Sequence, residues 1–590
     1  MKERDVVRHL VFAYIKGKSE RINMNVEKCR EAILSEDYRD FIVGNLQEKE
    51  FVQKFPNVLC KEKMGEFYQT FYVGGEEADP MRFDKYPYNS IPKCYTLLDV
   101  EAMSDAGIVQ VQNYPRLELQ GTGVLIGFVD TGIDYQNPVF QNLDGSSRIV
   151  GIWDQTVQEG TPPQGMFYGS EYRKDIIDEA LRSENPLALV PTVDVESHGT
   201  YLASVAAGGV SEEQRFLGAA PDAMIAMVKL KPAKQYLRDF YLIHTQEACY
   251  QENDIMLGIV YLNELANEMG VPLVLCVALG TNMGSHAAGS PLVGFLDTYA
   301  NTANRTIVIG AGNEADRRHH FLGESKNIGE EKQVEIRVGS GNLGFCTEIW
   351  SNAFNLFAVS VVSPSGERSY QFPIRSEQTQ EYQFLFEKTK ITIDYKVFVE
   401  RLNATLIFLR IEGPAEGIWK VIVEPIQVED GVFHLWLPVQ EFLQSDVYFL
   451  EPNPNYTITE PGSSLAGITV GFYNGKDNSV AIPSGRGYTR SERIKPDLVA
   501  PGVDVLGAIL RNRFVTRTGS SVATGIASGA AALMMEWVVY DVGREDVDST
   551  QIRNLLILGT EKTPNEIYPN RLSGYGRLNL YHSFEAIRQI

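Results

Sequence analysis

VLIGFVDTGID, residues 124–134, decides the fold of this 590-residue chain. A short apolar run ends in an aspartate and is followed at once by Thr-Gly, which indicates a strand buried on both faces that ends in a turn. Helix-like stretches such as residues 253–270 separate it from further apolar runs. These further runs are residues 148–154, 224–230, 273–280 and 306–313. Alternating strands and helices predict an α/β fold on a doubly wound parallel sheet.

The alternation of predicted strands and helices is interrupted in the second half of the chain. Residues 332–451 alternate apolar and polar positions, which predicts an inserted antiparallel β domain. The α/β texture returns at residues 466–474 and in the small-residue helix of residues 520–540. The N-terminal part is charged and carries short helix-like and strand-like segments, so we expect an α+β unit there. The predicted division is residues 1–96, then 97–330 together with 455–590, with 331–454 inserted.

Composition excludes some classes of function. A formal net charge of −22 argues against nucleic-acid binding, because phosphates would be repelled. No run approaches the roughly 18–20 uninterrupted apolar residues of a membrane helix, so no membrane span is expected. The first residues show no secretory signal, which favours a cytoplasmic location. Six scattered cysteines without a Cys-x-x-Cys pair predict free thiols; they are Cys29, Cys60, Cys94, Cys249, Cys276 and Cys346.

Four polar residues stand at the ends of predicted elements. Asp130 and Asn313 each end a buried strand, and His198 and Ser521 each begin a small-residue helix. Taken singly, Asp130 fits a turn equally well, whereas His198 fits a helix cap or a core residue better and Ser521 fits helix capping and close packing better still. Together they supply a nucleophile, a base, a group that orients the base and a donor for an oxyanion, which are the parts that acyl transfer needs.

The segments around these residues resemble the signatures of the subtilisin-like serine proteases. VDTGID, SHGT, AGN and GSSVAT match the four active-site motifs, and KPDLVAPG and SGYGRLNL match flanking ones. The order Asp, His, Ser is also that of subtilisin. The resemblance covers residues 115–320 and 460–585. It implies a serine endopeptidase in which Ser521 is the nucleophile and His198 is the general acid and base. Asp130 would then orient His198, and Asn313 would form the oxyanion hole together with the Ser521 N–H.

The same resemblance implies two walls of a substrate site. They are Ala278-Leu279-Gly280, whose backbone would pair with an extended substrate, and Gly310-Ala311-Gly312, beside the primary specificity pocket. One departure from the family pattern is Gly525, where a proline is usual. Glycine at this position is expected to loosen the start of the helix that carries Ser521.

Three features together are similar to the Csp proteases of clostridia: a retained N-terminal region, a β insertion between the Asn and Ser motifs, and an acidic chain. That subgroup implies a self-cleaved N-terminal prodomain that stays bound, a jelly-roll insertion, and activation of a cortex-lytic zymogen during spore germination. Processing is then expected near Tyr95, Thr96 and Leu97. The partners would be a polypeptide substrate, including a zymogen hydrolase, in a bacterial cytoplasm or spore.

Other classes of site fit less well. An aspartic protease needs two Asp-Thr-Gly segments, and the chain has one. His319-His320 indicates a solvated pair rather than a metal site, so we expect no metal and no cofactor. Calcium is frequent among subtilisin relatives, but no acidic loop places it here.

The alternative function is a pseudoprotease or regulatory binding protein of the same fold, and the complete set of motifs favours catalysis. The β insertion is expected to be a brace or a targeting module.

Overall fold

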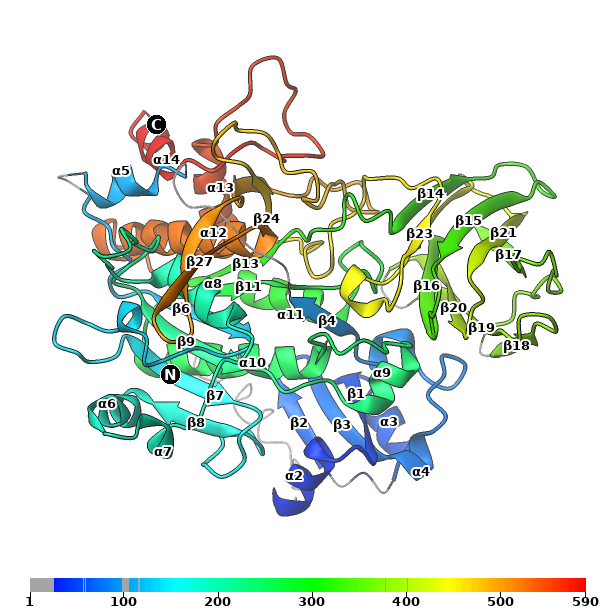
Figure 1. Cartoon of the computed structure of the whole chain (residues 1–590), viewed down its shortest axis with the longest axis horizontal. Coiled ribbons are helices and arrows are strands. Elements are labelled where there is room, and N and C mark those ends of the chain that lie inside the picture. The colour runs from blue at the N-terminus through cyan, green and yellow to red at the C-terminus, as the bar shows by residue number, and fades with distance from the viewer. Residues whose placement is uncertain are drawn as a thin grey trace, which may run out of the picture.

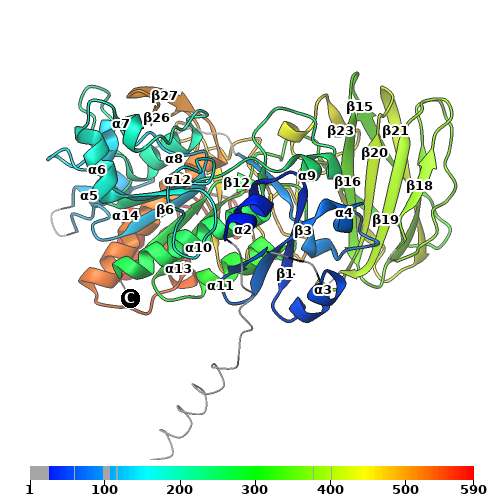
Figure 2. The ribbon, with the colours of Figure 1, turned by 90° about the horizontal axis from the view of Figure 1, so that it is seen from below.

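The computed structural model describes residues 26–56, 58, 60–97, 106–114, 117–376, 378–399 and 402–589. Figure 1 shows three parts of the molecule. We call residues 26–97 the N-terminal region and the strands from β14 to β23 the β insertion. The large parallel sheet with its helices is the α/β core. In the view from below, the N-terminal region lies against both the α/β core and the β insertion (Figure 2).

The α/β core is built on an eight-stranded sheet in the order β25-β24-β13-β11-β6-β9-β7-β8. Neighbouring strands are parallel except for β8, which pairs antiparallel with β7 at one edge. The strands are β6 (Leu125–Asp130), β7 (Ile149–Asp154), β8 (Ser170–Arg173), β9 (Met224–Lys229), β11 (Leu273–Val277), β13 (Arg305–Gly310), β24 (Ile468–Tyr473) and β25 (Leu498–Pro501). The predicted doubly wound α/β fold is confirmed.

Successive side chains of a strand point to opposite faces of the sheet, and in these strands both sets are largely apolar. Helices therefore cover both faces. Ile126 and Phe128 pack with one set of helices, whereas Leu125 and Val129 pack with the other. The first face carries α5 (Ile108–Gln112), α6 (Lys174–Arg182), α8 (His198–Ala207), α12 (Ser520–Glu536), α13 (Ser549–Leu558) and α14 (Leu580–Ile587), and the second carries α10 (Glu252–Met269) and α11 (Pro291–Ala300). Shorter elements at the rim are α7 (Pro186–Leu189), α9 (Gln235–Phe240), η2 (Pro138–Phe140), η4 (Trp537–Asp541) and the hairpin of β26 (Val505–Ile509) and β27 (Arg513–Arg517).

Helices α8 and α12 lie unusually close together. A Cβ on Gly529 would come within 2.3 Å of the Ala219 Cβ and 2.8 Å of the Ala206 carbonyl oxygen. Gly525 does not interrupt α12, which is continuous from Ser520 to Glu536. The expected loosening at this glycine stays a prediction; a Cβ there would lie 3.1 Å from the Leu202 side chain of the neighbouring helix.

By length and composition, the segment Ser520–Asp541 is the one helix in the described part of the chain that could cross a membrane. Its apolar window is 83% buried inside the protein, however. The segment is accordingly the central core helix of the α/β core (Figure 1).

The N-terminal region is a three-stranded antiparallel sheet with short helices. Its strand order is β1-β3-β2, with bounds β1 (Tyr38–Gly44), β2 (Cys60–Met64) and β3 (Tyr68–Gly74). The helices are α2 (Val26–Leu34), α3 (Glu48–Lys54), α4 (Gly75–Ala78) and η1 (Tyr88–Ser90). Asp40, at the centre of β1, makes a buried ion pair of 2.6 Å with Lys234 of the α/β core. The region is thus docked through charged as well as apolar contacts.

Two cysteines of the N-terminal region form a disulfide, Cys29–Cys60. The prediction of a free thiol is wrong for this pair. Helix α2 packs on strand β2 and brings the two residues, 31 positions apart in the chain, to a Cα–Cα distance of 5.0 Å. Spacing along the sequence does not reveal that contact. The other four cysteines are free and buried, as expected.

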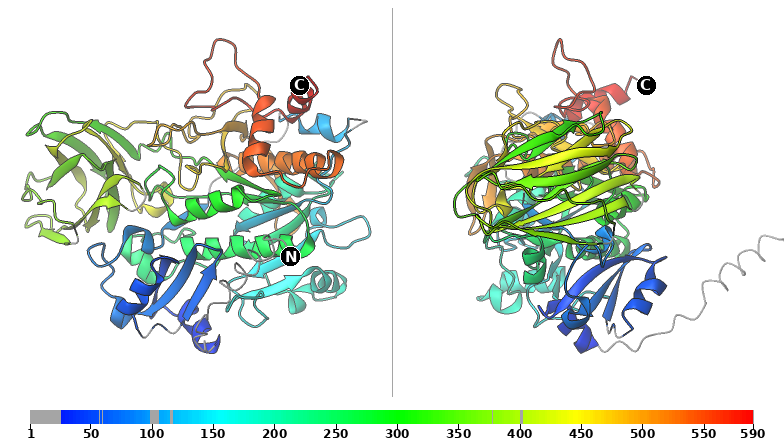
Figure 3. Two further views of the ribbon diagram at one scale, coloured as in Figure 1. Left: turned by 180° about the vertical axis from the view of Figure 1, so that it is seen from behind. Right: turned by 90° about the vertical axis from the view of Figure 1, so that its right-hand side faces the viewer.

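The β insertion consists of two antiparallel sheets, seen in the right panel of Figure 3. Large apolar side chains such as Phe345, Trp419 and Phe433 fill the space between them. The six-stranded sheet contains β14 (His320–Glu324), β16 (Gly344–Asn352), β18 (Gln380–Gln383), β19 (Lys390–Val399), β20 (Ala404–Glu412) and β22 (Val432–Trp436). The four-stranded sheet contains β15 (Lys332–Val338), β17 (Leu356–Val362), β21 (Gly417–Gln427) and β23 (Val447–Phe449), and η3 (Gln440–Phe442) precedes β23. The boundary at residue 331 stays a prediction, although β14 already pairs with β22.

The close contact of α8 and α12 gives a test of packing. We expect Gly529→Ala to lower the free energy of unfolding by about 1–3 kcal/mol, because the added methyl has no space. The matched control is Gly294→Ala in α11, where a Cβ would meet only the Tyr68 hydroxyl at 3.4 Å. That control should gain about 0.5–1 kcal/mol from helix propensity. Thermal unfolding of both variants measures the difference, and equal midpoints would contradict the account.

Candidate active site

Asp130, His198 and Ser521 meet at the carboxyl edge of the parallel sheet. The His198 Nδ1 lies 2.8 and 2.9 Å from the two Asp130 carboxylate oxygens. On the other side of the ring, His198 Nε2 lies 3.1 Å from the Ser521 hydroxyl oxygen. All three side chains are buried. The imidazole therefore sits between a carboxylate that fixes its orientation and a hydroxyl whose proton it can accept.

The local sequence explains why the imidazole reaches the carboxylate. Asp130 is the last residue of β6, and the Thr131 N–H donates to its Oδ1 at 2.7 Å. Gly199 follows His198 in the first turn of α8. A Cβ at this position would lie 2.2 Å from the Gly132 carbonyl oxygen and 3.0 Å from the Asp130 Oδ1. Only glycine allows the helix to start this close to the strand end.

Asp194 is a positioning residue that the sequence analysis missed. Its carboxylate accepts hydrogen bonds from the Ser197 N–H at 2.9 Å and from the Thr200 N–H at 2.8 Å, which caps the start of α8. It also accepts from the hydroxyls of Thr200 and Thr131. Burial raises the pKa of Asp194, although these hydrogen bonds oppose the rise. The sequence signal that could have indicated this cap is an acidic residue four positions before His198, where a helix is predicted to start.

Asn313 lies three residues after the end of β13, next to the start of α12. Its side-chain oxygen accepts a hydrogen bond from the Ser520 N–H at 3.0 Å, which orients the amide beside Ser521. The following residue, Glu314, accepts from the Asn282 amide at 2.9 Å and contacts His319 Nδ1 at 2.6 Å. Asn313 is therefore hydrogen-bonded to the residue that directly precedes Ser521.

The interpretation of His319-His320 as a solvated pair is wrong. Both side chains are buried at the junction of the α/β core and the β insertion. His319 contacts Glu314, and His320 Nε2 lies 3.0 Å from His434 Nδ1. Neighbouring strands enclose a loop that looked polar in the sequence. Among residues with described positions, no three His, Cys, Asp or Glu side chains form a group that could hold a metal ion.

The predicted substrate strand is paired with the chain's own N-terminal region. Strand β4 (Cys94–Leu97) lies between β10 (Tyr250–Gln251) and β12 (Leu279–Gly280), antiparallel to both. Leu279 is opposite Leu97 and Gly280 is opposite Thr96, while Tyr250 is opposite Tyr95. Ala278 is buried directly before β12. The structure thus brings the predicted processing region and the predicted substrate strand into one three-stranded sheet.

The second predicted wall, residues 310–312, follows β13. The Ala311 carbonyl accepts from the Thr459 N–H at 3.1 Å, and the Gly312 carbonyl accepts from the Gly485 N–H at 2.9 Å. Gly312 has a positive φ of 90°, and a Cβ there would lie 2.5 Å from the Thr459 side chain. The part of the chain that follows the β insertion therefore packs tightly against this wall.

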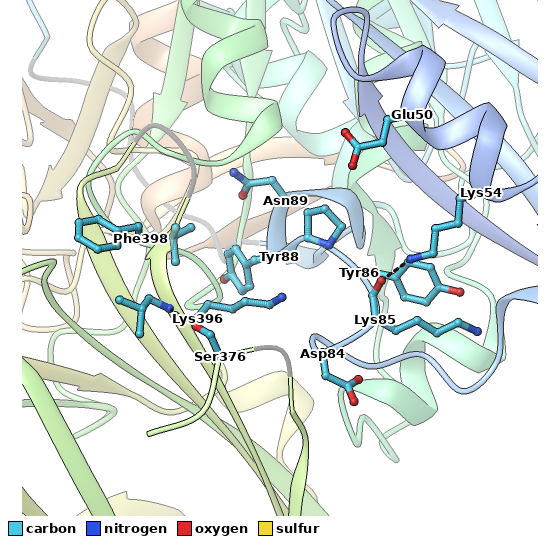
Figure 4. Close-up of a pocket in the computed structure, with 13 residues that line it drawn as sticks. Glu50, Lys54, Asp84, Lys85, Tyr86, Tyr88, Asn89, Ser376, Lys396 and Phe398 are labelled. Atoms are coloured by element: carbon cyan, nitrogen blue, oxygen red, sulfur yellow. Dashed lines mark hydrogen bonds between the residues drawn. The ribbon is translucent and has the colours of Figure 1, made fainter. Parts of the chain in front are cut away.

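A cleft of about 470 Å³ lies elsewhere, between the N-terminal region and the β insertion (Figure 4). Lys54, Lys85 and Lys396 line it together with Glu50 and Asp84. The Lys54 ammonium donates to the Lys85 carbonyl at 2.5 Å. No residue of the Asp130–His198–Ser521 group borders this cleft, so it is separate from the site.

Comparison with known proteins identifies the class to which this fold and site belong. The model of the subtilase family matches residues 121–380 and 445–576. The chain therefore belongs to the subtilase family, and the predicted resemblance is confirmed.

Among solved structures, the chain is similar to the CspB protease of Clostridium perfringens. The TM-score is 0.72 with 30% identity, covering 82% of this chain and 98% of that one. Serine protease AprX of Bacillus subtilis is 32% identical over 147 residues, which is 22% of this chain and 31% of AprX. The subtilisin-like protease SBT4.10 of Arabidopsis thaliana is 24% identical over 478 residues, 75% of this chain and 55% of that protein. The chain thus spans about a third of AprX and about half of SBT4.10.

The position of Asp194 leads to a testable prediction. Asp194→Asn should weaken the cap of α8 and cost about 1–3 kcal/mol of stability, because the Ser197 and Thr200 N–H groups donate to different oxygens and one of them would then face an amide NH2 group. His198 should then be less well placed, so a fluorophosphonate should label Ser521 more slowly. Asp144→Asn, at a fully exposed carboxylate, is the control. If Asp194→Asn labels as fast as the unmodified chain, Asp194 does not position His198.

Proposed function

We propose that this protein is a serine endopeptidase that uses Ser521 as nucleophile. The observation that carries the proposal is the continuous contact Asp130–His198–Ser521 beside a strand already paired with β12. In this mechanism His198 Nε2 takes the Ser521 proton as the hydroxyl oxygen attacks a peptide carbonyl. His198 then gives that proton to the leaving amine, and water releases the acyl group by the reverse route.

The oxyanion of each tetrahedral intermediate would form at the start of α12. Ser521 is the second residue of that helix, where backbone N–H groups and the positive end of the helix dipole favour negative charge. Asn313 would donate the second hydrogen bond. In subtilisin, loss of the corresponding asparagine costs about 10²–10³-fold in turnover. This site needs no cofactor in the proposed reaction.

We further propose that the first peptide bond cut is the chain's own, close to Tyr95, Thr96 and Leu97. Strand β4 already has the extended conformation and the backbone pairing of a bound substrate. After the cut, the N-terminal region would stay attached as a prodomain. Its support is the buried pair Asp40–Lys234 and the apolar cluster shared with α10.

A role like that of the clostridial Csp proteases follows as a proposal about the physiological substrate. Similarity over nearly the whole CspB chain supports limited proteolysis of a zymogen hydrolase, with the β insertion as a jelly roll and a spore or cytoplasmic location. The alternative is a regulatory binding protein of the same fold. Because β4 is paired with β12, it blocks the proposed substrate site. This favours the alternative only if the chain never cuts itself.

Self-processing can be tested directly. We expect the unmodified chain to separate into two bands on a denaturing gel, with a new N-terminus within a few residues of Leu97. Ser521→Ala should run as a single full-length band, because the nucleophile is gone. The matched control is Ser520→Ala, whose buried hydroxyl has no hydrogen-bond partner in the described structure and which should be cut normally. Cleavage of Ser521→Ala at the same bond would exclude self-processing.

The oxyanion donor gives an independent measurement. Asn313→Ala should slow processing about 10²–10³-fold while the fold is kept, because the side-chain donor is lost but Ser521 and His198 stay in contact. Quenched time courses followed by mass spectrometry give the rate. Processing at an unchanged rate would remove Asn313 from the proposed mechanism.

A further inference from the structure

Lys93, the residue just before β4, is fully buried. Its backbone N–H donates to the Glu252 Oε2 at 3.2 Å, and its carbonyl accepts from the Glu252 N–H at 3.0 Å. This contact continues the antiparallel pairing of β4 with β10 by one more residue. Lys93 is thus part of the strand that occupies the proposed substrate site.

The side chain of Lys93 lies near acidic groups from three elements, and of these Glu252 is within ion-pair distance. Its ammonium lies 3.8 Å from the Glu252 Oε2 and donates to the Tyr88 carbonyl at 3.2 Å. Burial lowers the pKa of Lys93, and the electrostatic attraction of Glu252, Glu348 and Glu460 opposes that shift. We call Glu252, Glu348 and Glu460 the acidic cage. All three carboxylates are buried, and they come from α10, β16 and the segment before β24.

Glu348 reaches the cage from the β insertion and is held there by three donors. They are the Tyr88 hydroxyl at 2.8 Å, the Gly284 N–H at 3.0 Å and the Trp350 indole N–H at 2.9 Å. Glu460 is tied to the substrate strand in another way, because its backbone pairs with Thr281, the residue after β12. The Glu460 Oε1 is buried without a hydrogen-bond partner in the described part of the chain.

Counting charges shows why the cage selects a cation. Lys93 brings the one positive charge that the strand offers these three buried carboxyl groups, with Arg490 as a further cation near Glu460, and an apolar side chain in place of Lys93 would remove that charge. Burial already raises the pKa of Glu460 to about 7 and also raises that of Glu348. Other titratable or charged groups close to the cage are Tyr88, Cys94, Tyr95, Tyr241 and Arg490.

We propose that the acidic cage is a specificity site of the peptidase, which selects polypeptides with a lysine at the position paired with Glu252. In the chain's own strand, this lysine lies two residues before the tyrosine paired with Tyr250. The inference rests on the proposed function and adds a substrate class to it. It also gives the β insertion a part in recognition, because Glu348 is one wall of the cage.

The first experiment does not need hydrolysis. In the full-length Ser521→Ala chain, Lys93→Met should lower the thermal midpoint by about 2–4 °C at pH 8. At pH 5.5 the loss should shrink to less than about half, because raised carboxyl pKa values let the cage take up protons as the pH falls through 7. Adding Glu460→Gln should restore part of the loss at pH 8, and Lys93→Arg should lose less than Lys93→Met.

The control is Lys85→Met, whose ammonium donates to backbone carbonyls outside the cage, including that of Ala78 at 2.6 Å. Its midpoint shift should be the same at both pH values. An equal shift for Lys93→Met at pH 8 and 5.5 would show that Lys93 only fills space, and it would overturn the acidic cage.

The second experiment measures selection. A peptide with the sequence of residues 91–103, with serine in place of Cys94, is offered to the processed wild-type protein next to the same peptide with norleucine in place of Lys93. We expect kcat/KM to fall at least about tenfold for the norleucine peptide. Values within twofold of each other would overturn the specificity site, because the acidic cage would then make no difference between lysine and norleucine. A wild-type chain that stays uncut and leaves both peptides intact would instead overturn the proposed function.

Discussion

The close approach of helices α8 and α12 is the contact on which the site depends. His198 and Ser521 occupy the first turns of these two helices, and a distance of 3.1 Å between imidazole and hydroxyl is possible only if the helices nearly touch. Gly529 makes room for the crossing. The sheet contributes the third member, because the end of β6 delivers Asp130 to the other side of the ring. The small residues that let α8 and α12 pack closely therefore also set the distance between His198 and the Ser521 hydroxyl.

The N-terminal region, the α/β core and the β insertion are joined around strand β4. Phe83 of the N-terminal region packs edge-on against Phe408 of the insertion at 4.8 Å, and Tyr88 packs similarly against Trp350 at 5.3 Å. Glu348 adds a hydrogen bond to each of the other two parts. Because these contacts are buried, the strand is held from several sides, and removing it would expose both apolar surface and carboxylates.

Much of the architecture could be predicted from the sequence, because buried parallel strands and small-residue helices leave local patterns. Asp130, His198, Asn313 and Ser521 sit at element ends that such patterns mark. The features that could not be predicted are contacts between distant residues. Cys29 and Cys60 meet only after α2 packs on β2, and Lys93 meets Glu252 across 159 positions. The burial of His319 depends on strands that close around a polar loop, which composition does not show.

The place of the β insertion in the chain has a consequence for synthesis. His198 and Ser521 are 323 residues apart, and the insertion lies between them. At about 5–20 residues per second, a ribosome needs roughly 15–65 s to travel from one to the other. Strands β24 and β25, which complete one edge of the parallel sheet, also emerge only after the insertion. A nascent chain therefore exposes His198 and strand β4 long before Ser521 has been made, so the imidazole has no hydroxyl partner until most of the chain has been synthesised.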